Sequence, residues 1–244
     1  MVNAAAVTVS KFRGSLGDHV KIDSDPETQS SYYEFVREEI APFLPERLER
    51  VLEVGCGAGG TLRWIKQRFP SARTIGIEIN SSLANALSAN VDEVHIVDGG
   101  IPPSGIELVD VILFLDVLEH FADPSAVLLQ YIQLLKTGGT VIISMPNVAH
   151  YSISFPLLFR RKFDYQEAGI MDRTHLHFFT DRSMVEMLNS VGLRVSEAIM
   201  NGPSDGRTKV FNRLTLGRFC HYLTKQYVMR CEVMNGQPEI RWRG

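Results

Sequence analysis

The chain has 244 residues, of which 45 % are hydrophobic and 22 % are charged, and its formal net charge is −3. This length suits one α/β domain with appendages, and the charge gives no support for a nucleic-acid binder that works through bulk positive charge. No apolar run is long enough to predict stable membrane insertion. The three cysteines lack CxxC spacing, which predicts neither a disulfide framework nor a zinc site, so we expect a cytoplasmic protein.

The beginning of the chain divides into two parts. Residues 1–29 have no sustained periodicity and are expected to form an N-terminal arm, followed by a single domain over residues 30–244. A capping-box pattern begins at Ser31, and an apolar face continues to Ile40, so we expect a helix that stops around Pro42 and Pro45.

A glycine-rich stretch, RVLEVGCGAGG over residues 50–60, predicts an apolar strand, a tight turn and the start of a helix. Gly55, Gly57 and Gly59 lack side chains where the backbone must turn and where a ligand can approach a helix N-terminus. Glu53 lies on the strand just before the turn. Because a carboxylate in such a place needs a partner, a cationic ligand would suit it.

The same glycines also fit the dinucleotide pattern GxGxxG, with its third glycine at Gly60. A pyrophosphate is anionic and would be repelled by Glu53. This disfavours a dinucleotide without excluding a nucleoside ligand.

Strands and helices alternate from residue 50 to residue 146, which predicts a parallel sheet with right-handed crossovers. Polar residues follow the strands where ligands bind in such sheets. Glu78 lies about 20 residues beyond the glycine turn, the spacing at which an acid accepts hydrogen bonds from ribose hydroxyls. Asp98 is either a ligand contact or a turn-forming aspartate before glycine, and Asp116 ends a nearly continuous apolar strand.

Three strings carry a resemblance to a known family. The strand with Glu53 and GxGxG resembles the first motif of class I S-adenosylmethionine-dependent methyltransferases. DVLEHFADP, from Asp116 to Pro124, resembles the fourth motif of the small-molecule members of the ubiquinone-biosynthesis type. SMPNVAHYS and DRTHLHFFT resemble a subgroup associated with bacterial glycan systems, in which the position of His177 is often arginine.

The resemblance implies a Rossmann-like fold, a doubly wound, mostly parallel seven-stranded sheet whose last strand is antiparallel. It also implies S-adenosylmethionine as cofactor and a small-molecule acceptor. The cofactor contacts that it implies are Glu53, Gly55, Cys56, Gly57, Gly59, Glu78, Ile79, Asp98, Gly99, Asp116 and Val117.

Residues 147–180 are expected to form a lid over the acceptor, with a helix over residues 151–163 interrupted by Pro156. A hydroxyl acceptor needs a general base, and histidine has a suitable pKa. His175 is the favoured base, followed by His150 and His120. An extended segment would place His175 on one side and Leu176 toward the core. Metal ligation by Asp172 with the two histidines of DRTHLHFFT is conceivable, but no metal is expected.

The function expected from this resemblance is methyl transfer to a hydroxyl of a sugar, glycan precursor or natural product, although a phenol, carboxylate or amine acceptor stays open. Two other classes are a nucleotide-dependent oxidoreductase on the same sheet and a non-catalytic cofactor-binding scaffold. The sequence leaves open whether the chain forms a homo-oligomer.

Overall fold

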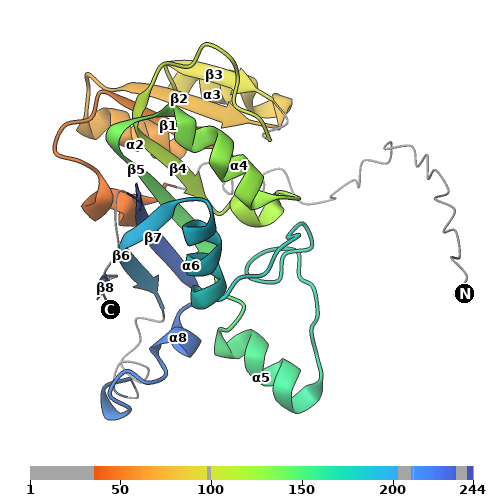
Figure 1. Cartoon of the computed structure of the whole chain (residues 1–244). Helices are drawn as coiled ribbons and strands as arrows, with labels where there is room; N and C mark the ends of the chain where they lie inside the picture. Colours follow the sequence, from red (N-terminus) through yellow and green to blue (C-terminus); the bar gives the residue numbers. More distant parts are fainter. Residues whose placement is uncertain (1–35, 98–99, 203–209, 211, 235–240, 244) are drawn as a thin grey trace, which may run out of the picture.

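The computed structural model describes residues 36–97, 100–202, 210, 212–234 and, for the backbone alone, 241–243. The predicted N-terminal arm, the start of the first predicted helix, and Asp98 and Gly99 lie outside the described residues. The described part is organised around one eight-stranded sheet in the order β3-β2-β1-β4-β5-β7-β6-β8 (Figure 1).

Five neighbouring strands of this sheet, β1 to β5, are parallel. β7 is antiparallel and lies between β5 and β6, while β8 is parallel to β6. The strands are β1 Arg50–Val54, β2 Arg73–Glu78, β3 Glu93–Ile96, β4 Val109–Leu115, β5 Leu135–Pro146, β6 Leu193–Asn201, β7 Gln226–Val233 and β8 Arg241–Arg243. The predicted parallel sheet with an antiparallel last strand is confirmed, and β8 is an eighth strand that the sequence did not predict.

Helices cover both faces of the sheet, as expected for a doubly wound fold. On one face, β-strand residues such as Leu52 and Phe114 pack with Leu128 and Met184 from two helices. On the other face, Val51 and its neighbours pack with residues that precede β1 and follow it. The helical elements are η1 Glu38–Phe43, α2 Gly60–Arg68, η2 Ser81–Leu83, α3 Ala84–Asn90, η3 Leu118–His120, α4 Pro124–Tyr131, η4 Ile132–Leu134, α5 Tyr151–Arg160, α6 Asp181–Ser190 and α8 Cys220–Leu223.

Three helical regions have distinct ends in the structure. The first predicted helix ends where expected: its described part is η1, a 3-10 helix that contains Pro42 and ends at Phe43. The helix α4 begins at Pro124 and ends at Tyr131, and the chain then passes through η4 directly into β5. Before α8, Leu216 and Gly217 have positive φ angles of 52° and 74°, a backbone conformation that separates α8 from the helical residues that precede it.

The predicted lid segment, residues 147–180, leaves the sheet and returns to the same place. Asn147 forms an isolated parallel bridge with Phe179, and the amide of Val148 donates to the carbonyl of Phe179 at 2.9 Å. Between these ends, α5 projects away from the sheet (Figure 1). The segment is therefore an excursion whose base is closed by backbone hydrogen bonds.

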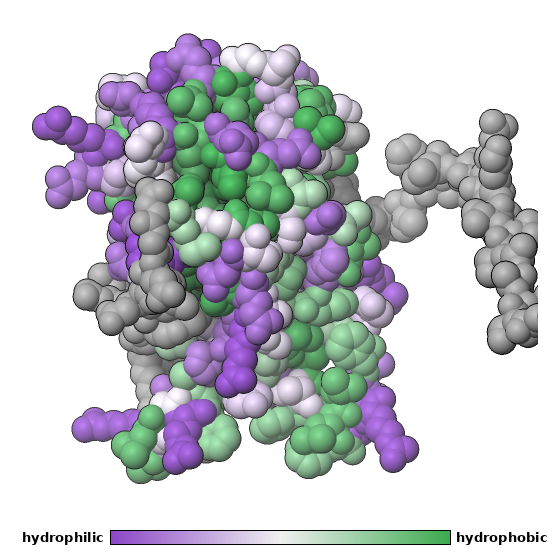
Figure 2. Space-filling model, in the orientation of Figure 1, coloured by the Kyte–Doolittle hydropathy of each residue, from purple (hydrophilic) through white to green (hydrophobic). Residues whose placement is uncertain are grey.

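Apolar side chains stand exposed on this excursion and near α8, where they gather at one end of the molecule (Figure 2). Leu158 and Phe159 of α5 are 72 % and 74 % exposed. Within the described ranges, no helix combines the length and the apolar character needed to cross a membrane. All three cysteines are free thiols, as their spacing predicts.

Candidate active site

The glycine turn lies at the carboxyl end of β1 and is tied to β2. The amides of Gly55 and Cys56 donate to the carbonyl of Ile77 at 2.8 and 3.2 Å. Gly55 has a φ of +72°, and a Cβ atom there would come within 2.6 Å of Val117 Cγ2. Only glycine fits this position, because both the backbone conformation and the contact with the loop after β4 exclude a side chain.

Two buried glutamates lie beside this turn. Glu78 is 6 % exposed, and its carboxylate accepts from the amides of Gly57 at 2.8 Å and Asn80 at 2.9 Å. Glu53 is 4 % exposed, and its Oε2 atom has no hydrogen-bond partner. Burial raises the pKa of Glu53 to about 8, with Arg37 opposing and Glu78 adding to the shift. A cation placed here would therefore relieve an uncompensated carboxyl group.

The other predicted cofactor residues have different surroundings. Cys56 is buried, and burial together with Glu53 raises the pKa of its thiol. Ile79 is 67 % exposed just after β2, an apolar surface that water contacts in this structure. Gly59 has a φ of +81°, and a Cβ atom there would lie 2.7 Å from Val91 Cγ2, so packing already requires this glycine.

Asp116 is the centre of a polar network that joins three parts of the chain. Its carboxylate pairs with Arg37, accepts from Ser144 Oγ at 3.0 Å and accepts from Gln226 Nε2 at 2.6 and 2.8 Å. Arg37 is 8 % exposed and also donates to Ser144 and Gln226. The structure thus places the predicted cofactor residue Asp116 where it also anchors the segment before η1 to β5 and β7.

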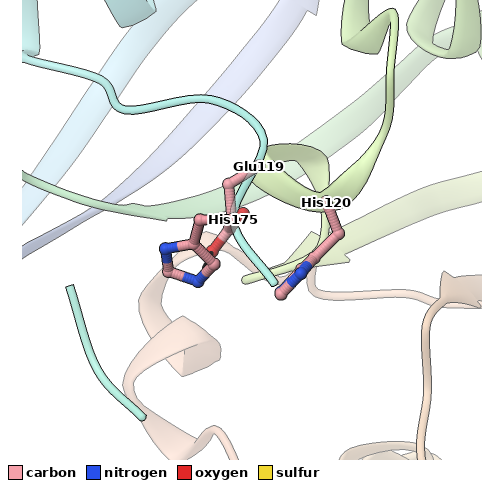
Figure 3. Close-up of side chains that lie close together, drawn as sticks. All are labelled: Glu119, His120 and His175. Carbon is pink, nitrogen blue, oxygen red and sulfur yellow. Dashed lines mark ion pairs between the residues drawn. The ribbon is translucent and has the colours of Figure 1, made fainter. Parts of the chain in front are cut away.

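Two of the predicted bases, His120 and His175, come together around Glu119. Figure 3 shows the side chains of Glu119, His120 and His175 close together, and the two imidazole rings contact each other edge to face with their centroids 4.8 Å apart. His175 Nε2 lies 3.9 Å from Glu119 Oε1. Among the described residues, these three form the group whose possible metal-ligand atoms all lie within 4.8 Å of one another.

The main chain of Glu119 brings this cluster together. Its carbonyl accepts from two consecutive amides, those of Leu176 at 2.9 Å and His177 at 3.1 Å. In a regular strand, the amides of successive residues point to opposite sides, so two consecutive amides cannot bind the same carbonyl. Leu176 and His177 therefore do not form a regular strand. The predicted alternation is therefore wrong for Leu176, whose side chain is 59 % exposed instead of facing the core.

His150, the remaining predicted base, lies outside the cluster. It is fully buried at the N-cap of α5, where its Nδ1 atom accepts from the amide of Ser152. Burial, with a smaller effect from Lys225, lowers its pKa to about 4. His150 therefore has a structural role as the N-cap of α5, and its buried position disfavours a role in proton transfer.

A protein-family model described as a methyltransferase domain matches residues 28–198. The chain belongs to this methyltransferase family. The match includes the glycine turn, both buried glutamates and the whole Glu119 cluster.

Curated relatives match a central part of this methyltransferase. A ubiquinone biosynthesis O-methyltransferase from Cereibacter sphaeroides (strain ATCC 17029 / ATH 2.4.9) is 35 % identical over 131 residues, which is 49 % of this chain and 50 % of the relative. An enzyme of the same name from Pseudomonas fluorescens (strain Pf0-1) is 33 % identical over 106 residues, 41 % of this chain and 45 % of the relative. The chain spans about half the length of the curated relatives it matches.

Solved structures share the fold at low sequence identity. An S-adenosylmethionine-dependent methyltransferase from Archaeoglobus fulgidus has a TM-score of 0.57 at 16 % identity, over 84 % of this chain and 92 % of its own. A polyketide O-methyltransferase from Brevibacillus brevis, in complex with S-adenosyl-L-homocysteine, has a TM-score of 0.53 at 17 % identity, over 86 % and 77 % of the two chains. The methyltransferase family and the fold expected from the sequence are confirmed.

Several residues of the methyltransferase site were not selected from the sequence. Glu119 lies inside the quoted string DVLEHFADP, but it was not chosen, because nothing local shows that it is buried. It is 1 % exposed, and burial raises its pKa, with Asp116 adding to the shift. Arg37, Ser144 and Gln226 carry no motif, and only the packing of η1, β5 and β7 brings them together.

The buried carboxyl of Glu53 generates a prediction about pH. Its pKa in the folded state, about 8, is above the ordinary value of 4.5. Protonation of Glu53 therefore contributes fully to the free energy of unfolding below pH 4.5, and this contribution is lost as the pH rises from 4.5 to 8. Glu53→Gln cannot ionise and avoids this loss. In urea unfolding of the protein free of methyl donor, the variant should gain on the wild type by up to about 1.4 kcal/mol per pH unit in that window.

The matched control is Glu167→Gln, because Glu167 is exposed and pairs only with Arg173 at the surface. Its stability should follow the wild type at every pH. Parallel curves for Glu53→Gln and the wild type would contradict the assigned burial of the Glu53 carboxyl.

Proposed function

We propose that this methyltransferase moves a methyl group from S-adenosylmethionine to a hydroxyl oxygen of a small molecule, such as a sugar, a glycan precursor or a natural product. The observation that carries the proposal is the pair of buried glutamates at the ends of β1 and β2, one of which has a carboxylate oxygen with no hydrogen bond. Two carboxylates beside a glycine turn suit a ligand that offers both a cation and hydroxyl groups.

The residues present fit this donor. Glu53 would pair with the ammonium group, which would let its carboxyl ionise in place. Glu78 would accept from ribose hydroxyls, since each carboxylate oxygen can take more than the one amide it now binds. Bound there, the donor supplies a methyl group already activated by its sulfonium. Ile79, Asp98, Gly99, Asp116 and Val117 stay predicted contacts.

The acceptor side lies along the predicted lid. From the cluster, a series of aromatic contacts leads outward: His175 to Phe178 at 6.1 Å, then Phe178 to Tyr165 at 5.9 Å and to Phe163 at 5.6 Å. Phe163 and Tyr165 are 39 % and 44 % exposed. Aromatic side chains offer apolar faces on which a ring-shaped acceptor can pack, and this supports a small cyclic molecule as the acceptor.

A hydroxyl acceptor must lose its proton, and the cluster of Glu119, His120 and His175 is where this would happen. Burial lowers the pKa of His175, with His120 adding to the shift, so the ring is neutral at pH 7. A neutral imidazole next to a buried carboxyl group offers a lone pair for the proton. His175 is the leading candidate of the three predicted bases, His120 is its neighbour and His150 is the weakest.

The two other classes of function fit less well. An oxidoreductase would hold an anionic pyrophosphate beside Glu53 and Glu78, and the family match supports a methyltransferase. A non-catalytic scaffold that binds the cofactor would keep the same donor site, so an activity screen of acceptors with labelled donor is what separates this second alternative. Calorimetric titration with NAD tests the oxidoreductase alternative, and we expect it to detect no binding. The cytoplasmic location stays a prediction.

Replacing Glu78 tests the donor site. Glu78→Ala should weaken binding of both S-adenosylmethionine and S-adenosylhomocysteine by about 1–3 kcal/mol, because the ribose hydroxyls and the amide of Gly57 lose their acceptor. Isothermal titration calorimetry measures this change. Glu167→Ala, at an exposed site, is the control, and unchanged affinity in Glu78→Ala would remove Glu78 from the donor site.

Replacing His175 tests the acceptor site. His175→Ala should lower turnover by about 10²–10⁴ while donor affinity stays nearly constant, since the cluster acts only on the acceptor. Steady-state kinetics with labelled donor and calorimetry with S-adenosylhomocysteine give the two values. His177→Ala is the matched control, because the His177 ring contacts Ala122 and Phe179 instead of the cluster. Turnover within a few-fold of the wild type would exclude His175.

The lid proposal predicts a change in backbone exchange. Amides of residues 151–176 should exchange more slowly when S-adenosylhomocysteine and an acceptor found by an activity screen are both bound. Amides of β4 in the core should not change. Hydrogen–deuterium exchange with mass spectrometry resolves the two regions, and equal protection of the lid with and without ligands would indicate a rigid cap.

A further inference from the structure

Helix α5 carries an apolar stripe that faces away from the body of the protein. Its members, Tyr151, Phe155, Leu158 and Phe159, recur at the spacing i, i+4, i+7 and i+8 and are each between 41 % and 74 % exposed. In an α-helix this spacing places the side chains on one strip about 100° wide, the width with which a surface helix normally faces a core. The buried Ile153 lies on the opposite side of α5 and faces the body instead. The part of the chain that the structure describes therefore leaves this stripe largely uncovered.

The stripe is a separate surface from the aromatic side chains of the predicted acceptor side. The rings of Tyr151 and Phe155 have centroids 6.2 Å apart, and those of Phe155 and Phe159 are 5.9 Å apart. Phe163 and Tyr165 instead belong to the series of rings that leads to the proposed base. Within the described residues no ring contact joins the two series, so a partner other than the acceptor is needed to cover the stripe.

A second exposed apolar segment lies at the same end of the molecule (Figure 2). It precedes α8 and includes Leu214 and Leu216, which are 78 % and 89 % exposed. Asn147, at the base of α5, joins this segment to the stripe, because its Nδ2 atom donates to the carbonyls of His221 and Thr224 at 2.8 Å each. The stripe and the two leucines therefore form parts of one surface.

The size of this surface matches what a stable protein–protein contact needs. The stripe with Leu214 and Leu216 exposes roughly 600 Å², if a fully exposed side chain offers about 150 Å², the lower end of the aromatic range. The largest apolar patch of a typical monomer covers about 300–600 Å². A standard interface covers about 800 Å² on each partner, of which about 60 % is non-polar, so about 500 Å² of apolar surface is enough.

The charges around the stripe indicate which partner fits it. No charged residue occurs between Tyr151 and Phe159, and basic residues begin only at Arg160, the last residue of α5. A helix that lies on a bilayer surface carries Lys and Arg along its polar face, which α5 does not. A second copy of the chain presents an equally uncharged stripe, so the contact creates no like-charge repulsion. Beyond the stripe, Lys162 lies 3.9 Å from Asp164, and charges of both signs are usual at the polar rim of an interface.

We propose that two copies of this chain form a two-fold symmetric dimer, in which the two α5 stripes pack against each other in antiparallel directions. Leu214 and Leu216 of each chain flank this contact. In a two-fold contact the same surface serves both chains, which suits a stripe that is apolar along its whole length. Antiparallel packing also places opposite ends of the two helix dipoles side by side, which is the favourable arrangement. The dimer does not depend on the proposed function.

Sedimentation velocity of the full-length protein over a wide range of concentration tests the dimer. The wild type should sediment as a species of twice the chain mass that dissociates on dilution. In the double variant Leu158→Glu/Phe159→Glu the dissociation constant should rise at least about a hundredfold, because the contact would bury carboxylates without partners. Leu129→Glu is the matched control, since Leu129 is an exposed leucine of α4, which lies away from this end (Figure 1), and it should dimerise as the wild type does.

The double variant should fold, because Leu158 and Phe159 are mostly exposed in the single chain and their replacement removes little packing. Thermal unfolding followed by circular dichroism checks this. A wild type that stays monomeric at every concentration, or a double variant that dimerises as tightly as the wild type, would overturn the dimer. A series of larger assemblies would exclude the two-fold arrangement.

Co-sedimentation with vesicles of phosphatidylcholine and phosphatidylglycerol excludes the other use of an exposed apolar stripe. The dimeric wild type should stay in the supernatant. A monomer that binds the vesicles through Leu158 and Phe159, and loses this binding in the double variant, would assign the surface to a membrane and overturn the dimer. Neither measurement involves methyl transfer, so the dimer and the proposed function can fail independently.

Discussion

The site depends on carboxylates that the parallel sheet buries at one edge without compensating them. Glu53, Glu78 and Glu119 are each at most 6 % exposed, and Glu53 and Glu119 keep carboxylate oxygens that make no hydrogen bond. Burial of this kind lowers the stability of the free protein, because desolvation is not repaid by protein donors. A ligand cation would stabilise these two unsatisfied carboxyl groups most. Glu53 lies beside the glycine turn, and Glu119 lies at the base of the predicted lid.

The carboxylate of Asp116, unlike those of Glu53 and Glu119, has protein partners for its oxygens. Its carboxylate is satisfied by Arg37, Ser144 and Gln226, which come from three separate parts of the chain. This network holds the loop after β4 in place, including a positive φ of 53° at Asp116 itself. A fixed loop keeps Val117 against Gly55 on one side and Glu119 against the lid on the other. The donor and acceptor sides of the proposed site would therefore share one rigid support.

The sequence predicted the fold well because periodicity and turn chemistry act locally. The apolar strands and the glycine turn follow from neighbouring residues. Glu53 and Glu78 were found because their spacing from the glycines is fixed along the chain. Glu119 with His175, and Asp116 with Arg37, could not be found in this way. Their contacts join distant segments, and nothing in the sequence indicates that the carbonyl of Glu119 binds two amides of the returning lid.

That carbonyl also couples the lid to the chemistry. The amides of Leu176 and His177 bind the backbone of Glu119, while the side chains of Glu119 and His175 form the cluster. A movement at this end of the lid therefore changes the distance between His175 Nε2 and Glu119 Oε1. The bridge between Asn147 and Phe179 fixes where the segment leaves the sheet and where it returns. Bending is therefore confined to the residues between Asn147 and Leu176. In the proposed function, closure of the predicted lid over an acceptor and assembly of the Glu119 cluster are a single event, and the group proposed to accept the proton is complete only when the acceptor is enclosed.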